Sequence, residues 1–191
     1  TLTNSLLPDI LRAGLSQTEN SQLYPLELPV EEFDSCIEAL KQAGVYGAAV
    51  AAPHKTLAAK LGTKFFTVRH ALGVANTLEI RQDGIYAQNT EVPAIQMLTQ
   101  NLEPATALVL GAGSGARSVA VALMENGWKV RLWNRNGMRS RLLQTTLKAF
   151  GDIEILPHAE PVGCSLIVNA TSLGAKAGQR PPVNWKPIKS G

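Results

Sequence analysis

The second half of the chain alternates short apolar runs with stretches of helical spacing. The unbroken run Ala107–Leu110 predicts a strand buried on both faces, as in a parallel sheet. Further strands are predicted at 129–133, 153–156 and 165–169, with helices at 116–125 and 138–150. This order of elements predicts half of a doubly wound α/β fold.

The first half of the chain predicts a more mixed arrangement. Apolar residues at helical spacing predict helices at 5–13 with a stop at Gly14, from 30 to a stop at Gly44, from 55 to about 61, and at 90–102. Strands are predicted at 23–30 and, in buried form, at 47–52, and Gln82-Asp83-Gly84 predicts a hairpin between 76–81 and 85–88. The stretch 101–104 is typical of a linker, so we expect two α/β domains at 1–103 and 104–191.

Charge is distributed unevenly between these two parts. Residues 1–103 contain 7 lysines and arginines against 11 acidic residues, a net charge of −4, whereas residues 104–191 contain 11 against 4, a net charge of +7. The basic half therefore predicts an anionic partner. The apolar fraction of 45% excludes a disordered chain.

Several other classes of protein are disfavoured by the sequence. Cys36 and Cys164 lie far apart without a partner motif, which argues against a disulfide scaffold and a structural zinc site. The three histidines lack metal-ligand spacing, so we expect no metal. No apolar run approaches the ~20 residues that span a bilayer, and no signal peptide is visible, so we expect a cytoplasmic protein.

Because the chain lacks an initiator Met and stops at Gly191, we expect a fragment whose first domain lacks its first strand and whose second domain is truncated at the C-terminus.

A glycine-rich turn follows the run Ala107–Leu110 and opens the next predicted helix. Gly111-Ala112-Gly113-Ser114-Gly115-Ala116 matches G-x-G-x-x-A in the strand–turn–helix context that a dinucleotide site requires. The first glycine makes the tight turn, the second admits the pyrophosphate, and Ala116 lets helix and strand pack closely. The alternative is an ordinary strand–helix turn of small residues, which explains the context less well.

The residues after the next predicted strand indicate which dinucleotide binds. An NAD site usually carries an acidic residue about 20 positions on, which holds the ribose 2′-hydroxyl. Here Asn134-Arg135-Asn136 occupies that place, and Arg139 follows. Guanidinium groups match a 2′-phosphate in shape and charge, so the sequence predicts NADP rather than NAD. Arg131 and Arg141 are expected to belong to the same basic cluster.

Six segments occur in the order and spacing of a known family. The chain contains GAAVAAPHK at 47–55, GVANTL at 73–78, QNTE at 88–91, GAGSGAR at 111–117, NRNGMR at 134–139 and NATSLG at 169–174. Together they resemble the motifs of shikimate dehydrogenases. The resemblance implies a Rossmann-type NADP-binding domain at 104–191, a substrate-binding domain at 1–103, and reversible NADPH-dependent reduction of 3-dehydroshikimate to shikimate in the cleft between them.

The resemblance also assigns roles to individual residues. Lys55 matches the catalytic lysine, with Glu91 in the place of its aspartate partner. Asn76 would bind substrate hydroxyls, and the hydroxyls of Thr1 and Thr3 would bind the substrate carboxylate. Thr171, within NATSLG, is expected to join the glycine turn and the Asn134–Arg139 segment in binding the cofactor. The partners implied are a small anionic substrate and neither nucleic acid nor membrane, with the protein a monomer or homodimer. His54 is expected to pack or lie at the surface.

The sequence departs from the family pattern at three site positions. Ala49 and Ala51 stand where the family has Asn and Thr, and Glu91 is one methylene longer than Asp. Positional errors of about 1 Å can cost around 100-fold in rate. Two alternatives therefore stay open, which are a catalytically impaired NADPH-binding protein and an enzyme acting on quinate or a related cyclitol carboxylate.

Overall fold

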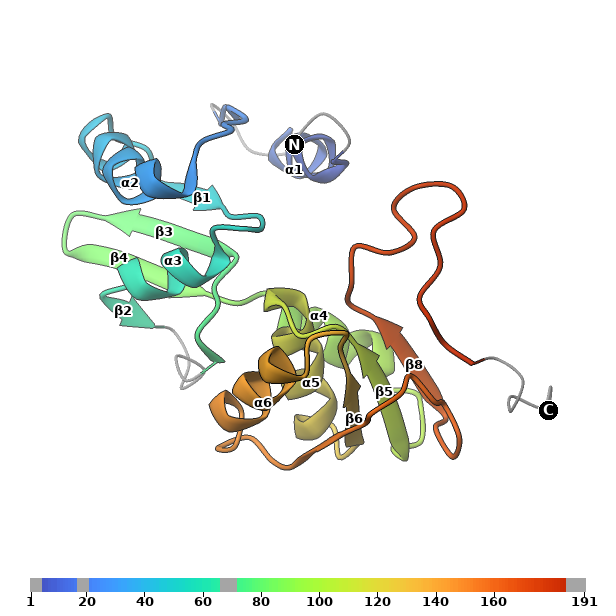
Figure 1. The fold of residues 1–191 in the computed structure, drawn as a ribbon. Helices are drawn as coiled ribbons and strands as arrows, with labels where there is room; N and C mark the ends of the chain where they lie inside the picture. Colours follow the sequence, from blue (N-terminus) through green and yellow to red (C-terminus); the bar gives the residue numbers. More distant parts are fainter. Residues whose placement is uncertain (1–4, 17–20, 66–71, 185–191) are drawn as a thin grey trace.

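The chain folds around two separate four-stranded sheets (Figure 1) in a computed structural model that describes residues 5–16, 21–65 and 72–184. The elements before residue 90 are α1 (Leu7–Leu15), the 3-10 helix η2 (Val30–Glu32), α2 (Phe33–Gln42), β1 (Gly47–Ala49), α3 (Lys55–Leu61), β2 (Lys64–Phe65), β3 (Thr77–Arg81) and β4 (Gly84–Gln88). They are followed by α4 (Glu91–Thr99), β5 (Thr106–Leu110), α5 (Ser114–Glu125), β6 (Lys129–Trp133), α6 (Gly137–Thr146), β7 (Ile153–Ile155) and β8 (Leu166–Asn169).

The first sheet has the strand order β1-β3-β4-β2 and is mixed, because only β2 runs parallel to its neighbour β4. Side chains alternate along β3, so that Leu78 and Ile80 point into the core while their neighbours are partly exposed. Phe33 and Ile37 of α2 pack into the same core. We refer to this sheet with α2 and α3 as the mixed-sheet lobe.

The second sheet has the order β7-β6-β5-β8 with all strands parallel, as the alternation of strands and helices predicts. The central strand β5 is covered on both faces. Ala107 and Val109 belong to the core on the helix side, whereas Leu108 and Leu110 pack with Ala159 on the other side. This two-sided burial explains the unbroken apolar run. We refer to this sheet with α4, α5 and α6 as the parallel-sheet lobe.

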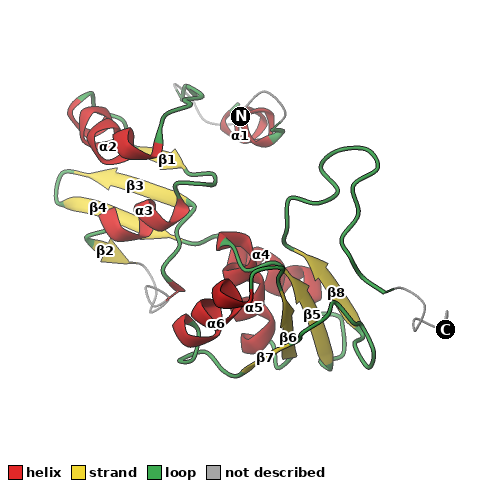
Figure 2. Cartoon of the chain, in the orientation of Figure 1, coloured by secondary structure: helices red, strands yellow, loops and turns green. Residues whose placement is uncertain are grey.

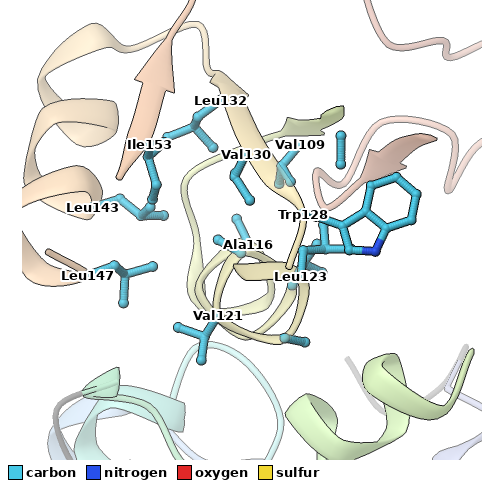
Figure 3. Packing of buried hydrophobic residues seen from close by; sticks show 14 of the residues in the cluster. Val109, Ala116, Val121, Leu123, Trp128, Val130, Leu132, Leu143, Leu147 and Ile153 are labelled. Carbon is cyan, nitrogen blue, oxygen red and sulfur yellow. The ribbon is translucent and has the colours of Figure 1, made fainter. Parts of the chain in front are cut away.

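Helix α5 occupies the centre of the helix-side core. Figure 3 shows Ala116 and Leu123 of α5 beside Val109 and Val130 of the adjacent strands. Ala116 is completely buried, as the close packing of helix on strand requires. Burying a side chain such as Leu123 contributes about 1.5–3 kcal/mol, so this packing fixes the position of the glycine turn that precedes α5.

The two lobes are joined by segments that cross between their cores. Leu72 and Val74 belong to the core of the parallel-sheet lobe, Ala75 to that of the mixed-sheet lobe, and Val92 of α4 again to the parallel-sheet lobe. Helix α4 packs against α5. The division of the chain into domains at Glu103 stays a prediction.

Three expectations for the first half are wrong, and one strand was not predicted. Residues 23–30 form no strand, because no strand in the described part of the chain pairs with them. The strand at 47–52 ends at Ala49 and lies at a sheet edge rather than buried. The first helix continues through Gly14 to Leu15, and the two-residue strand β2 was not expected.

Two further features complete the fold. Helix α1 stands apart from both sheets in Figure 1 and has no buried residue. Residues 170–184 after β8 form a long loop without helix or strand (Figure 2). Within residues 5–16, 21–65 and 72–184, no helix has both the length and the hydropathy needed to cross a membrane.

Candidate active site

Lys55 and Glu91 face each other as the first residues of two helices from different lobes. The Nζ of Lys55 forms an ion pair with Oε1 of Glu91, and their side chains are 14% and 29% exposed. A carboxylate in the first turn of α4 is favoured by the helix dipole, but an ammonium at the start of α3 is not. Glu91 therefore compensates a cation that its own helix does not stabilise, and the pair remains accessible to a ligand.

Backbone and amide hydrogen bonds hold the two helix starts together. The backbone N–H of Ala75 donates to the carbonyl of Lys55 at 2.9 Å. Asn76 Nδ2 donates to Thr90 Oγ1 at 2.9 Å, and the Thr90 N–H donates to Asn76 Oδ1 at 2.8 Å. The segments GVANTL and QNTE are thus joined beside the ion pair, and within the described residues the second amide hydrogen of Asn76 is left for a ligand.

Asn89 and Ser118 lie behind the ion pair and were not anticipated from the sequence. Asn89 Oδ1 accepts from the N–H groups of Glu91 and Val92, both at 3.0 Å, and so caps the start of α4. Its Nδ2 donates to Ser118 Oγ at 3.0 Å, and Ser118 Oγ donates to Glu91 Oε2 at 2.8 Å. The Asn before Thr90 and Glu91 fits an N-cap pattern and was predictable, whereas Ser118 on an apolar helix gives no such signal.

The glycine turn meets the geometric requirements of a phosphate-binding loop. Gly111 has φ +108, and a Cβ there would lie 2.9 Å from the Ala170 carbonyl oxygen, so only glycine fits. A Cβ at Gly113 or Gly115 would meet nothing within 4 Å, which leaves open space at the start of α5. The N-cap residue Gly113 has no side chain to cap this helix, and the first N–H groups of α5 can therefore bind an anion.

The Asn134–Arg139 segment places exposed cations beside the carboxyl end of β6. Asn136 caps α6 by accepting from the Arg139 N–H at 3.2 Å, and Asn134 Nδ2 donates to the Asn136 carbonyl at 2.9 Å. Arg135 and Arg139 are exposed, and in the described ranges neither forms an ion pair. Their guanidinium groups are therefore free to bind a phosphate.

The loop after β8 lies next to the glycine turn. Asn169 Oδ1 accepts from the N–H and the Oγ1 of Thr171, at 3.1 and 2.7 Å, and Asn169 Nδ2 donates to the Leu173 carbonyl at 2.8 Å. The Cγ2 of Thr171 would lie 3.1 Å from a Cβ at Gly111. Since parallel strands end at one edge of their sheet, the glycine turn, the Arg135 segment and Thr171 share that edge, as a dinucleotide site requires.

Two arginines differ from the sequence expectation. Arg131 does not join the basic cluster, because its Nε pairs with Glu154 at 2.8 Å and its Nη1 donates to the Val162 carbonyl at 2.8 Å. Arg117, in the first turn of α5, was not singled out. It is partly buried, its Nη1 lies 3.1 Å from a Cβ built on Gly73, and burial lowers its pKa. A half-buried guanidinium at a helix start is a further candidate anion ligand.

The remaining predicted residues contribute less to this geometry. Thr1 and Thr3 lie outside the described residues. His54 stacks on Phe33 with ring centroids 5.0 Å apart, in agreement with a packing role. Ala49 and Ala51 are exposed on either side of Val50, whose N–H donates to the Asn76 carbonyl at 2.8 Å. No group of three potential metal ligands occurs among the described side chains.

Comparison with known proteins identifies relatives over the whole chain, although no family model matches it. The chain is 31% identical over 202 residues to the shikimate dehydrogenase (NADP(+)) of Rubrobacter xylanophilus, covering all of this chain and 71% of that protein. The crystal structure of shikimate dehydrogenase from Aquifex aeolicus matches with a TM-score of 0.85 at 27% identity, over 98% of this chain and 72% of that one.

A second solved structure matches the arrangement of both lobes. The shikimate 5-dehydrogenase of Thermus thermophilus, solved in complex with NADP(H) and shikimate, has a TM-score of 0.77 and 25% identity over 91% of this chain and 66% of that one. The alignment with the Rubrobacter protein covers the whole chain and so includes both sheets. The chain belongs to the family of NADP(+)-dependent shikimate dehydrogenases, which are oxidoreductases.

Proposed function

We propose that the protein catalyses the reversible, NADP(H)-dependent reduction of 3-dehydroshikimate to shikimate. The observation that carries the proposal is the Lys55–Glu91 ion pair, formed where the two lobes meet and left partly accessible. The pair forms although Glu91 is longer than Asp, which favours an active site over an impaired one. The substrate is then a small carboxylate that enters between the lobes.

The parallel-sheet lobe would hold the cofactor at the carboxyl edge of its sheet. The N–H groups at the start of α5 would bind the pyrophosphate, and Arg135 with Arg139 would bind the 2′-phosphate. Ala112, Ser114 and Thr171 lie at the same edge and would line the site. When bound, NADPH supplies the hydride.

Lys55 would act as general acid toward the carbonyl oxygen of the substrate. As the carbonyl is reduced, negative charge develops on its oxygen, and an ammonium within hydrogen-bond reach both stabilises this charge and supplies the proton. In the reverse direction the neutral amine accepts the hydroxyl proton. Glu91 would orient the amine and balance its charge, and Asn76 would hold a ring hydroxyl with its remaining amide hydrogen.

The decisive experiment measures shikimate-dependent reduction of NADP⁺ by the purified chain and by Lys55→Ala. We expect Lys55→Ala to lower kcat by about 10²–10⁴-fold, the usual contribution of general acid–base catalysis, with NADP⁺ binding retained. Lys60→Ala is the matched control, because Lys60 lies on the same helix, is exposed, and is not part of the ion pair.

The same assay separates the proposal from other activities. Quinate replaces shikimate in one arm and NAD⁺ replaces NADP⁺ in another, and we expect the highest kcat/KM with shikimate and NADP⁺. Turnover of quinate alone, or equal rates for wild type and Lys55→Ala, would contradict the proposed function.

A further inference from the structure

The hydroxyl of Ser118 is placed against the catalytic pair from inside a helix core. Ser118 lies on α5 in the second turn, is completely buried, and is surrounded in sequence by apolar residues that form the core. A buried hydroxyl costs free energy unless its hydrogen-bonding capacity is used. Its contacts therefore show what the serine does at this position.

The contacts of Ser118 divide the two oxygens of Glu91 between different donors. A serine hydroxyl has a single proton, and the acceptors near it are Glu91 Oε2 at 2.8 Å and the Ser114 carbonyl at 3.4 Å. The shorter, charge-assisted bond to the carboxylate is the stronger one. Glu91 Oε2 is thus bound to α5, and Oε1 remains with Lys55.

Asn89 fixes the serine in turn. Its Nδ2 donates to Ser118 Oγ at 3.0 Å and to the Val74 carbonyl at 3.3 Å, while its Oδ1 holds the start of α4. The hydroxyl therefore accepts from Asn89 and donates to Glu91. With the acceptor side occupied by the amide, its proton is directed to the carboxylate.

We infer that Ser118 is a positioning residue that orients the Glu91 carboxylate toward Lys55. The inference rests on the proposed function, and it explains how a glutamate serves in this site. The longer side chain spans the distance from the first turn of α4 to both Lys55 and α5. Without the hydroxyl, Oε2 would lose its protein donor and the carboxylate could rotate away from the ammonium.

The arrangement also connects the acid–base pair to the cofactor loop. Ser118 follows Ser114, the first residue of α5, by four positions, so one short helical segment carries both the glycine turn and the hydroxyl that holds Glu91. A change in the position of the α5 start is thus transmitted to the carboxylate without any contact between the cofactor and Glu91.

The test is a double-mutant cycle on shikimate oxidation with Ser118→Ala, Glu91→Asp and the two combined. We expect Ser118→Ala to lower kcat by about tenfold, as expected for a hydrogen bond to a charged group, with KM for shikimate and for NADP⁺ nearly unchanged. In the Glu91→Asp background the same change should cost less than about twofold, because the shorter side chain no longer reaches the hydroxyl. Equal losses in both backgrounds would overturn the inference.

Ser140→Ala is the matched control. Ser140 is an equally buried serine on α6 whose Oγ makes no hydrogen bond within the described structure. We expect this variant to keep wild-type kcat, and a loss equal to that of Ser118→Ala would mean that any buried serine change has the same effect.

A readout that does not require activity separates this inference from the proposed function. Urea unfolding of wild type and the three variants should show that Ser118→Ala raises the unfolding equilibrium constant by about tenfold more in the wild-type background than in the Glu91→Asp background. If wild type does not oxidise shikimate but the unfolding cycle shows this coupling, the proposed function fails and the contact stands. An additive unfolding cycle overturns the contact itself.

Discussion

At the residue scale, the distinctive feature of the candidate site is the position of Lys55. Its ammonium lies at the N-terminus of α3, where the helix dipole disfavours a positive charge. Glu91 at the start of α4 compensates this charge, and Ser118 on α5, itself bonded to Asn89, holds the second oxygen of the Glu91 carboxylate. The order of sequence motifs could predict Lys55 and Glu91, because each motif carries its own residue types. It could not predict Ser118, since a serine among the apolar residues of a helix resembles any small core residue.

The specificity for NADP also belongs to the residue scale. We expect Arg135→Ala to raise KM for NADP⁺ by about tenfold or more, because a charge-assisted hydrogen bond to the 2′-phosphate is lost, and to leave KM for NAD⁺ nearly unchanged. Steady-state kinetics with both cofactors measures the effect. Lys148→Ala removes the same charge from an exposed residue beyond α6 and serves as the control. An equal rise for the two cofactors would place Arg135 away from the 2′-phosphate.

The elements differ in how far the sequence could define them. The parallel-sheet lobe was predicted nearly element by element, because its central strand β5 is buried on both faces and so shows as an unbroken apolar run. The alternation at 23–30 was misleading, since a strand exists only where a partner strand supplies hydrogen bonds. Strand β2 has two residues, Lys64 and Phe65, too few for any periodicity to show.

The hairpin of β3 and β4 carries a charge cluster that makes its stability depend on pH. Lys64 forms an ion pair with Asp83 in the turn, and Tyr86 Oη donates to the same carboxylate at 2.9 Å. The hydrogen bond from Lys64 is the main cause that lowers the pKa of Asp83 below its usual range, and the same contact raises the pKa of Lys64. The ion pair therefore stabilises the fold at pH values between the pKa of Asp83 and the pKa of Lys64, where both groups are charged.

The sign of the pH effect follows from the direction of the Asp83 pKa. The carboxylate contributes stability above the usual pKa of an aspartate, about 4, and this contribution is lost as the pH falls through the lower pKa of the folded state. We expect Asp83→Asn to lower the Tm slightly at neutral pH and to match wild type at strongly acidic pH. Glu103→Gln, an exposed acid in the linker, is the control for thermal melts. A difference in Tm that is constant across pH would contradict the assignment.

At the scale of the whole molecule, the glycine turn and the Lys55–Glu91 pair lie on different elements, and α5 follows the first and is bonded through Ser118 to the second. The comparisons place both lobes in one family fold, with the chain covering 71% of its Rubrobacter relative. A ligand that binds only the folded state raises the free energy of unfolding. Binding can therefore be tested without any substrate.

We expect NADP⁺ at about 100 times its Kd to raise the free energy of unfolding by about 2.7 kcal/mol. Urea titrations with and without NADP⁺ measure this shift, and NAD⁺ at the same concentration should give a smaller one. Absence of any shift at saturating NADP⁺ would rule out binding to the native state.

The paired crossings between the two cores have a mechanical consequence. The chain leaves the parallel-sheet lobe between Val74 and Ala75 and returns between Gln88 and Glu91, and the bonds between Asn76 and Thr90 tie these two crossings side by side. Lys55 is bonded through its backbone carbonyl to Ala75, and Glu91 follows Thr90, so the ion pair lies beside this tie. A displacement of one sheet relative to the other would therefore change the Lys55–Glu91 separation less than it changes separations farther from the tie.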